Sequence, residues 1–308
     1  MGTAGLACAS LQALSRAGGM QVIAVVTQPD RPKGRDLKLS GSPVKELALK
    51  LNLTVVQPRK AREEIFIGQL RELQPDLIVV AAYGQILPES ILNLPRSGCL
   101  NVHTSLLPKY RGAAPIQWAI LDDEPRTGVT IMKMAAGLDT GDILTQRETP
   151  ITDKDNAETL HDRLAIIGAE LLVETIPQFV SGRINPRAQI EAGASYARKI
   201  SKEDGLIDWS RPARQIWNRI RAFTPWPGTY TFHSSGGRKR LLKIHEAAVE
   251  TTLSGTAGKI LCADKTGIVV GCGEQGLRIL SLQLEGGKKL QATEFLSGHL
   301  LSAGDQVG

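Results

Sequence analysis

The residues of this sequence best suited to chemistry are Asn101 and His103, which stand two positions apart just after the apolar Leu100. In an extended segment, residues i and i+2 point to the same side. Both polar side chains can therefore face one cavity, with Leu100 and Val102 turned away. An amide N–H can stabilise a developing oxyanion, and an imidazole can exchange a proton near neutral pH. The pair indicates chemistry at a carbonyl carbon, whereas an isolated N-x-H motif is more typical of a structural histidine.

The surrounding sequence predicts the elements that must position this pair. Short apolar runs predict strands over 21–27, 53–57, 77–82, 99–102, 128–133 and 143–148. Helical spacing predicts helices over 43–51, with Ser42 as N-cap, and over 63–73, 86–92 and 157–181. Residues 29–42 are rich in Gly, Pro and charge and predict a loop. Strands that alternate with helices indicate an α/β fold with a mainly parallel sheet, and such sheets bind ligands beyond their strand ends.

The second half of the chain has a different pattern and a different charge. Residues 182–195 show little periodicity and predict a linker, and five short strands over 229–284 predict a small β-barrel. We therefore expect a first domain over 1–182, a linker over 183–200 and a second domain over 201–308. The net charge is −1 over 1–182 and +7 over 183–308. This asymmetry favours a polyanionic partner for the second half, although a merely soluble basic domain has the same signature.

Several classes of protein are disfavoured by composition. The four cysteines show no C-x-x-C spacing and predict free thiols in a reducing cytosol. No histidine stands in a zinc-ligand pattern, so we expect no metal. No apolar run approaches the roughly 20 residues that span a bilayer, and the start has too little positive charge for a signal peptide. We expect a soluble cytoplasmic protein.

Four blocks of sequence resemble one enzyme family. Residues 101–120, NVHTSLLPKYRGAAPIQWAI, and residues 137–143, GLDTGDI, closely resemble the two catalytic segments of the folate-dependent formyltransferases. Residues 27–35, TQPDRPKGR, and the motifs between Tyr196 and Gly228 resemble the branch of that family that acts on methionyl-tRNA. The resemblance implies a Rossmann-like catalytic domain followed by an OB-like β-barrel. It also implies transfer of a formyl group from 10-formyltetrahydrofolate to the α-amine of methionine on initiator tRNA, for translation initiation.

The resemblance also implies roles for particular residues. Asn101 and His103 stabilise the oxyanion, and Asp139 pairs with His103 and helps to take up the proton of the amine; the alternative is that Asp139 only forms the turn. The folate site is expected to comprise Ser105, Leu106, Leu107 and Pro108, with Ile86 and Leu87. The expected tRNA contacts are Arg31, Lys33, Arg35 and Lys38 in the first half and Arg198, Lys199, Lys202, Arg238, Lys239, Arg240 and Lys243 in the second. The family resemblance further implies a monomer.

The beginning of the chain departs from the family pattern. Residues 1–8 resemble the turn that follows the first strand of the family, and the apolar strand itself is absent. Because this strand lies centrally in such sheets, we expect a gap between the strands predicted at 21–27 and 77–82. Our hypothesis is that several residues precede Met1 in the natural protein.

Three alternative functions share some of these features. A formyltransferase acting on an amino sugar or a purine precursor would use the same three polar residues without a basic second domain. A formyl-folate hydrolase would replace the amine by water. A noncatalytic tRNA-binding protein would keep the scaffold after losing activity.

Overall fold

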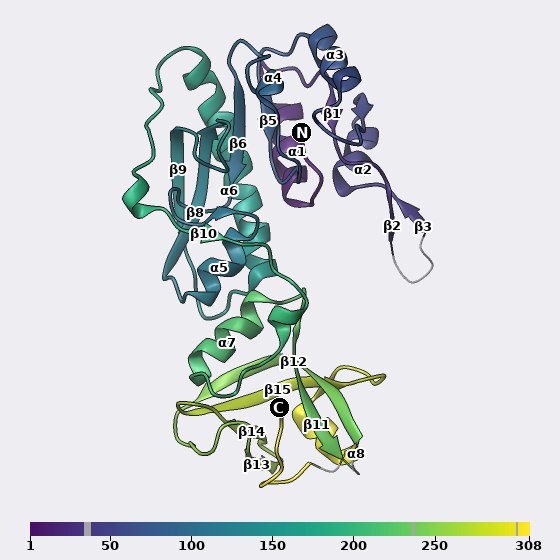
Figure 1. The fold of residues 1–308 in the computed structure, drawn as a ribbon, viewed down its shortest axis with the longest axis vertical. Helices are drawn as coiled ribbons and strands as arrows, with labels where there is room; N and C mark the ends of the chain where they lie inside the picture. The colour runs from purple at the N-terminus through teal and green to yellow at the C-terminus, as the bar shows by residue number, and fades with distance from the viewer. Residues whose placement is uncertain (34–37, 236–237, 300) are drawn as a thin grey trace. The chain divides into compact units, whose positions relative to one another are not determined.

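The computed structural model describes residues 1–33, 38–235, 238–299 and 301–308 (Figure 1). The chain forms two compact units. The first consists of Met1–Pro115, Arg126–Pro150 and His161–Ala197, and the second of Ile116–Pro125, Ile151–Leu160 and Arg198–Gly308. Most of the segment predicted as a linker therefore belongs to the first unit. The three predicted domain boundaries stay a proposal.

The first unit has the predicted α/β class. Its main sheet has the strand order β5 (Ile78–Val80), β6 (Cys99–His103), β8 (Arg126–Lys133), β9 (Ile143–Pro150). Strands β5 and β6 are parallel, whereas β8 is antiparallel to both of its neighbours. Two short parallel pairs lie outside this sheet: β1 (Val25–Val26) with β4 (Val55–Val56), and β7 (Arg111–Gly112) with β10 (Tyr196–Ala197). The strand predicted over 21–27 is thus shorter than expected.

Helices cover these strands. They are α1 (Leu6–Arg16), α2 (Pro43–Lys50), α3 (Glu64–Leu73), α4 (Glu89–Leu92), α6 (Ala157–Val180) and the short 3-10 helix η1 (Glu191–Gly193). The Ser42 hydroxyl accepts a hydrogen bond from the Lys45 backbone N–H, which confirms the predicted N-cap. Helix α6 packs on the sheet so closely that a Cβ added at Gly168 would lie 2.8 Å from Val102 Cγ1. The face of β6 that carries Leu100 and Val102 is therefore buried, which leaves the opposite face for chemistry.

The expected gap at the start of the chain is present and is bridged at one end. The Met1 α-amine donates to Val79 O at 2.6 Å, Ala81 N donates to Met1 O, and Gly2 N donates to Val26 O. Met1 and Gly2 thus lie between the backbones of β1 and β5. Next to Met1 a mainly apolar cavity of about 650 Å³ lies between residues 20–26 and 75–79.

The prediction of a loop over 29–42 was wrong for residues 31–33 and 38–40, which form strands. Strands β2 (Arg31–Lys33) and β3 (Lys38–Ser40) pair antiparallel with Arg31 opposite Ser40, and Figure 1 shows this hairpin extending outward from α2. None of the side chains that the structure describes on this ribbon is buried, which agrees with the lack of apolar alternation in its sequence. The helix predicted over 86–92 is also shorter, since only Glu89–Leu92 is helical.

The second unit is built on a small antiparallel β-structure, as predicted. Its strands are β11 (Thr229–Ser235), β12 (Arg238–Glu250), β13 (Ile260–Asp264), β14 (Gly267–Gly271), β15 (Gly276–Leu284) and β16 (Leu290–Gln291), and the order is β11-β12-β15-β14-β13 with β16 beside β15. The chain end closes the sheet, because Val307 bridges to His233 and Gln306 bridges to Lys259. The helices are α5 (Pro115–Leu121), of which Pro115 is assigned to the first unit, α7 (Ala213–Ala222), α8 (Ala292–Gly298) and the short η2 (Glu203–Gly205).

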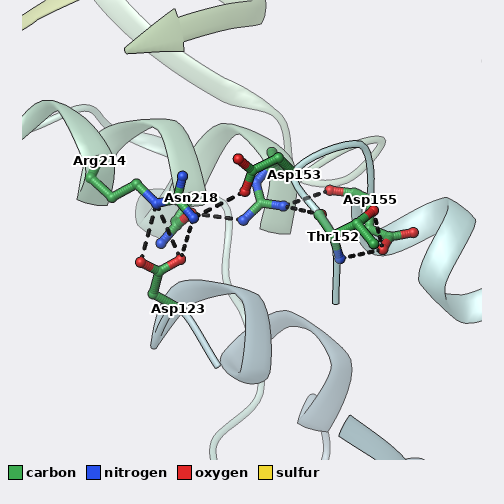
Figure 2. A network of polar contacts seen from close by, with 7 residues as sticks. Asp123, Thr152, Asp153, Asp155, Arg214 and Asn218 are labelled. Carbon is green, nitrogen blue, oxygen red and sulfur yellow. Dashed lines mark hydrogen bonds and ion pairs between the residues drawn. The ribbon is translucent and has the colours of Figure 1, made fainter. Parts of the chain in front are cut away.

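A polar cluster ties α7 to two loops of the same unit (Figure 2). Arg214 pairs with Asp123 at 2.9 Å and with Asp153 at 3.1 Å. The buried Arg221 donates to Thr152 O, Asp155 O and Asn218 Oδ1. Hydrogen bonding to Arg214 is the main cause that lowers the pKa of Asp123.

In the part of the chain that the structure describes, no helix has both the length and the apolar character of a membrane span.

Candidate active site

Strand β6 delivers two polar side chains to one face of the main sheet. Asn101 is opposite Met132 and His103 opposite Thr130 in the register with β8, so both project from the side that α6 does not cover. Asn101 is half-buried, and the His103 side chain is only 6% exposed. The alternation inferred from the sequence therefore places both groups as expected.

Asp139 meets both of these side chains from the loop between β8 and β9. Asn101 Nδ2 donates to Asp139 Oδ1 at 3.4 Å, and His103 Nδ1 lies 3.7 Å from Asp139 Oδ2. The Gly112 N–H donates to the same Oδ2 at 2.8 Å. The structure thus brings the amide, the imidazole and the acid together although Asp139 is distant in sequence.

The tautomer of His103 follows from its second nitrogen. His103 Nε2 lies 2.9 Å from Tyr110 O, and because a carbonyl oxygen only accepts, Nε2 carries the hydrogen. Nδ1 is then the nitrogen that faces Asp139, and it is the nitrogen able to exchange a proton with a substrate.

Gly112 is required by two features of the same turn. Its φ is +116°, a conformation that other residues rarely adopt, and a Cβ there would lie 2.7 Å from Ala197 O. The glycine thus fixes the positions of Tyr110 O and Gly112 N. The turn after β6 thereby supplies an acceptor for His103 and a donor for Asp139.

The expected folate residues divide into buried and accessible groups. Ser105, Leu107 and Leu87 are buried; the Ser105 hydroxyl donates to Lys109 O and Leu107 packs with Met132 and Ile143. Leu106 and Pro108 are partly exposed, and Ile86 is 84% exposed. The apolar surface open to a flat ring is therefore that of the second group, and the role of all six residues stays a prediction.

The basic residues expected on the first unit lie on the β2–β3 hairpin. Arg31 is exposed and donates to Gln28 Oε1 at 2.6 Å. Lys33 and Lys38 are paired across the hairpin, but their side chains lie outside the described part of the structure. Arg35 also lies outside the described residues.

Among the basic residues expected on the second unit, Arg198 is engaged by two neighbours. The Arg198 guanidinium pairs with Asp204 at 2.5 Å and lies 5.3 Å from the centre of the Trp118 ring. Hydrogen bonding to Arg198 is the main cause that lowers the pKa of Asp204. Lys199 and Lys202 are exposed.

Strands β11 and β12 place two aromatic rings, which the sequence reasoning missed, beside two of the expected lysines. Tyr230 is opposite Lys243, Phe232 opposite Leu241 and Ser234 opposite Lys239, so these six side chains share one side of the ribbon. Lys239 Nζ lies 4.5 Å from the centre of the Phe232 ring. The exposed Arg240 is in the alternate register, and the Arg238 side chain is outside the described part of the structure. The alternation along β12 already predicts that Lys239 and Lys243 lie on one side of the strand. The pairing with β11 then brings the two aromatic rings beside these lysines.

Among the described residues, no group of three or more His, Cys, Asp or Glu side chains is arranged to hold a metal ion. The four cysteines are free.

The chain is similar to known proteins over almost its whole length. Residues 2–176 match the family model described as formyl transferase, and residues 199–300 match that of the formyl transferase C-terminal domain. The chain is 49% identical over 308 residues to the methionyl-tRNA formyltransferase of Geobacter metallireducens. The aligned region covers 100% of this chain and 97% of that protein. The chain is also 49% identical over 305 residues to the methionyl-tRNA formyltransferase of Caldanaerobacter subterraneus subsp. tengcongensis, with 99% and 97% covered.

Among solved structures, an N-formyltransferase from Helicobacter canadensis in complex with folinic acid and dTDP-3-aminofucose has a TM-score of 0.66 to this chain. It is 19% identical and the match covers 94% of this chain and 97% of that one. At this identity the likeness shows a shared fold.

Proposed function

The chain belongs to the methionyl-tRNA formyltransferases of the formyl transferase family, and on that premise we propose that its Asn101–His103–Asp139 site transfers the formyl group of 10-formyltetrahydrofolate to the α-amine of methionine on initiator tRNA. The observation that carries the proposal is the convergence of these three side chains at the C-terminal end of β6. An amide donor and an imidazole, each within 4 Å of one carboxylate, can stabilise the oxyanion and move the proton in acyl transfer to an amine.

Each residue has a defined part in the proposed reaction. Asn101 Nδ2 and His103, protonated at Nδ1, donate to the oxyanion that forms when the neutral amine attacks the formyl carbon. Asp139 accepts the proton that the amine nitrogen loses as the new C–N bond forms. That proton is returned to the folate nitrogen when its bond to the formyl carbon breaks and the carbonyl re-forms. Tyr110 O and Gly112 N fix the orientation of the imidazole and of the carboxylate.

The folate would bring the activated one-carbon unit to these groups. Leu106 and Pro108, with the exposed Ile86, offer apolar surface for its flat ring. The buried Ser105, Leu107 and Leu87 would act by holding the backbone of that surface. Leu107 N donates to Thr130 Oγ1 and Leu107 O accepts from Gln146 Nε2, so the turn is anchored to β8 and β9.

Contacts to tRNA are assigned to two basic surfaces. On the first unit the β2–β3 hairpin carries Arg31, Lys33 and Lys38 on its strands, with Arg35 between them. On the second unit the face formed by Tyr230, Phe232, Lys239 and Lys243 combines cations with aromatic rings, a combination typical of single-stranded nucleic-acid binding. Phosphate contacts by these residues would make tRNA affinity fall steeply with salt.

The test is formylation of charged initiator tRNA with labelled 10-formyltetrahydrofolate. We expect His103→Ala and Asp139→Asn to lower the rate about 10²- to 10⁴-fold with tRNA retention unchanged. Asp142→Asn is the matched control, since Asp142 lies in the same loop and, among the described residues, its side chain makes no hydrogen bond; its backbone oxygen accepts from Lys133 N. Label that stays off the tRNA, or that moves instead to a nucleotide-linked amino sugar, would overturn the proposal.

A further inference from the structure

The loop that carries Asp139 is held from behind by a side chain of the supposed linker. Gln189 Nε2 donates to the backbone oxygen of Asp139 at 2.8 Å and to that of Gly141 at 2.7 Å. An amide nitrogen has two hydrogens, and here both are used on one turn of the chain. Gln189 therefore fixes the backbone on either side of Thr140.

Gln189 is itself oriented by an almost fully buried arginine. Arg111 Nε donates to Gln189 Oε1 at 3.1 Å, which determines which end of the amide faces the loop. The two remaining nitrogens of Arg111 bind both oxygens of Glu191 at 3.0 Å each. The Arg111 side chain is 1% exposed and Glu191 is 74% exposed. Hydrogen bonding to Glu191 is the main cause that raises the pKa of Arg111, while burial acts against it.

This brace acts on a residue with an unfavourable backbone. Asp139 has a φ of +50°, in the left-handed region that side chains other than glycine seldom occupy. Such a conformation persists where its surroundings hold it. The same residue must place one carboxylate oxygen near Asn101 Nδ2 and the other near His103 Nδ1. A relaxed backbone at Asp139 would turn the carboxylate away from both.

The brace also couples the two sides of the site. Arg111 belongs to β7, one residue before the Gly112 N–H that binds the Asp139 carboxylate. Strand β7 pairs with β10, and Tyr110 N donates to Ser195 Oγ. Residues 189–197 thus hold the turn after β6 and the Asp139 loop at once.

We propose that Gln189, oriented by Arg111 and Glu191, is a positioning residue that keeps the Asp139 carboxylate directed at His103 and Asn101. The inference rests on the proposed function of that site. Gln189 contacts the backbone of the loop and no reacting atom.

The first test is Gln189→Met, which keeps the length of the side chain and removes its polar atoms. We expect kcat for Met-tRNA formylation to fall about 10²-fold, the effect of a displacement near 1 Å, with KM for tRNA and for folate within about threefold. Gln178→Met is the matched control, because Gln178 is an exposed glutamine of the same unit whose amide binds Glu174 O on its own helix. It should leave both parameters unchanged. A Gln189→Met enzyme with normal kcat would overturn the inference.

A double-mutant cycle separates positioning from a general structural role. In the Asp139→Asn background, Gln189→Met should have no further effect on kcat, since the group that it positions is already removed. An equal loss in both backgrounds would contradict the inference. Gln189→Glu serves as a second variant of the same shape, because it keeps the acceptor for Arg111 but loses both donors, and it should behave like Gln189→Met. If Asp139→Asn itself retains activity, the proposed function fails; if only the Gln189 variants retain it, this inference fails alone.

Discussion

Replacing Gly141 by alanine should disable the site without unfolding the protein. A Cβ built at Gly141 would lie 1.8 Å from Lys133 O and 2.9 Å from Lys133 C, at the point where β8 ends. Real Cβ atoms essentially never come closer than 3.0 Å to such an atom, so the contact must lengthen by about 1.2 Å. The φ angle of Gly141 is not positive, so alanine can adopt the same backbone conformation. The clash, and not the conformation, is therefore the perturbation.

The displacement falls on the Asp139 loop. Gly141 stands two residues after Asp139, and its backbone oxygen is one of the two that Gln189 binds. The clashing atom is a strand carbonyl and cannot rotate away. Because a shift of about 1 Å in a catalytic group typically costs about 10²-fold in rate, we expect kcat/KM to fall by that factor.

The assay is single-turnover formylation of charged initiator tRNA, with thermal unfolding measured on the same samples. Gly137→Ala is the control within the same loop: its Cβ would meet Thr140 Oγ1 at 2.3 Å, the tip of a side chain that can change rotamer. We expect Gly137→Ala to lose less than about tenfold. The reasoning would be refuted by a Gly141→Ala enzyme within threefold of the parent rate, or by equal losses in the two variants.

A further prediction concerns stability. Arg221→Ala should lower the free energy of unfolding by about 3–5 kcal/mol, because it leaves Thr152 O and Asp155 O without this donor and bares Trp217. The exposed Arg211→Ala should change it by less than about 0.5 kcal/mol, and similar urea midpoints for the two variants would refute the role of the cluster in Figure 2.

Local sequence patterns correctly predicted the structural features that depend on residues close in sequence. The period of two along β6 placed Asn101 and His103 on one side, because alternation is a property of any extended chain. Ser42 was identified as an N-cap from its position before Pro43 and the helical spacing that follows. The small β domain followed from short apolar runs separated by turn residues.

The structural prediction from sequence was incomplete where none of the described side chains of a segment is buried. The β2–β3 ribbon lacks apolar alternation and was predicted as a loop. Residues 182–195 lack periodicity and were predicted as a linker, yet Gln189, Glu191 and Ser195 hold the two sides of the site. A glutamine that binds two backbone oxygens leaves no pattern in the sequence, since its partners lie about 50 residues away.

The sequence by itself therefore determined which groups are available for chemistry and the α/β class that presents them. Only the tertiary structure decided how those groups are oriented: that His103 turns Nδ1 toward Asp139, that Gly112 N binds the same carboxylate, and that Arg111 directs Gln189 at the loop behind it. The physical reason is that side-chain alternation and capping arise between neighbouring residues, whereas the orientation of a polar side chain is set by whichever distant polar atoms the fold brings into contact with it.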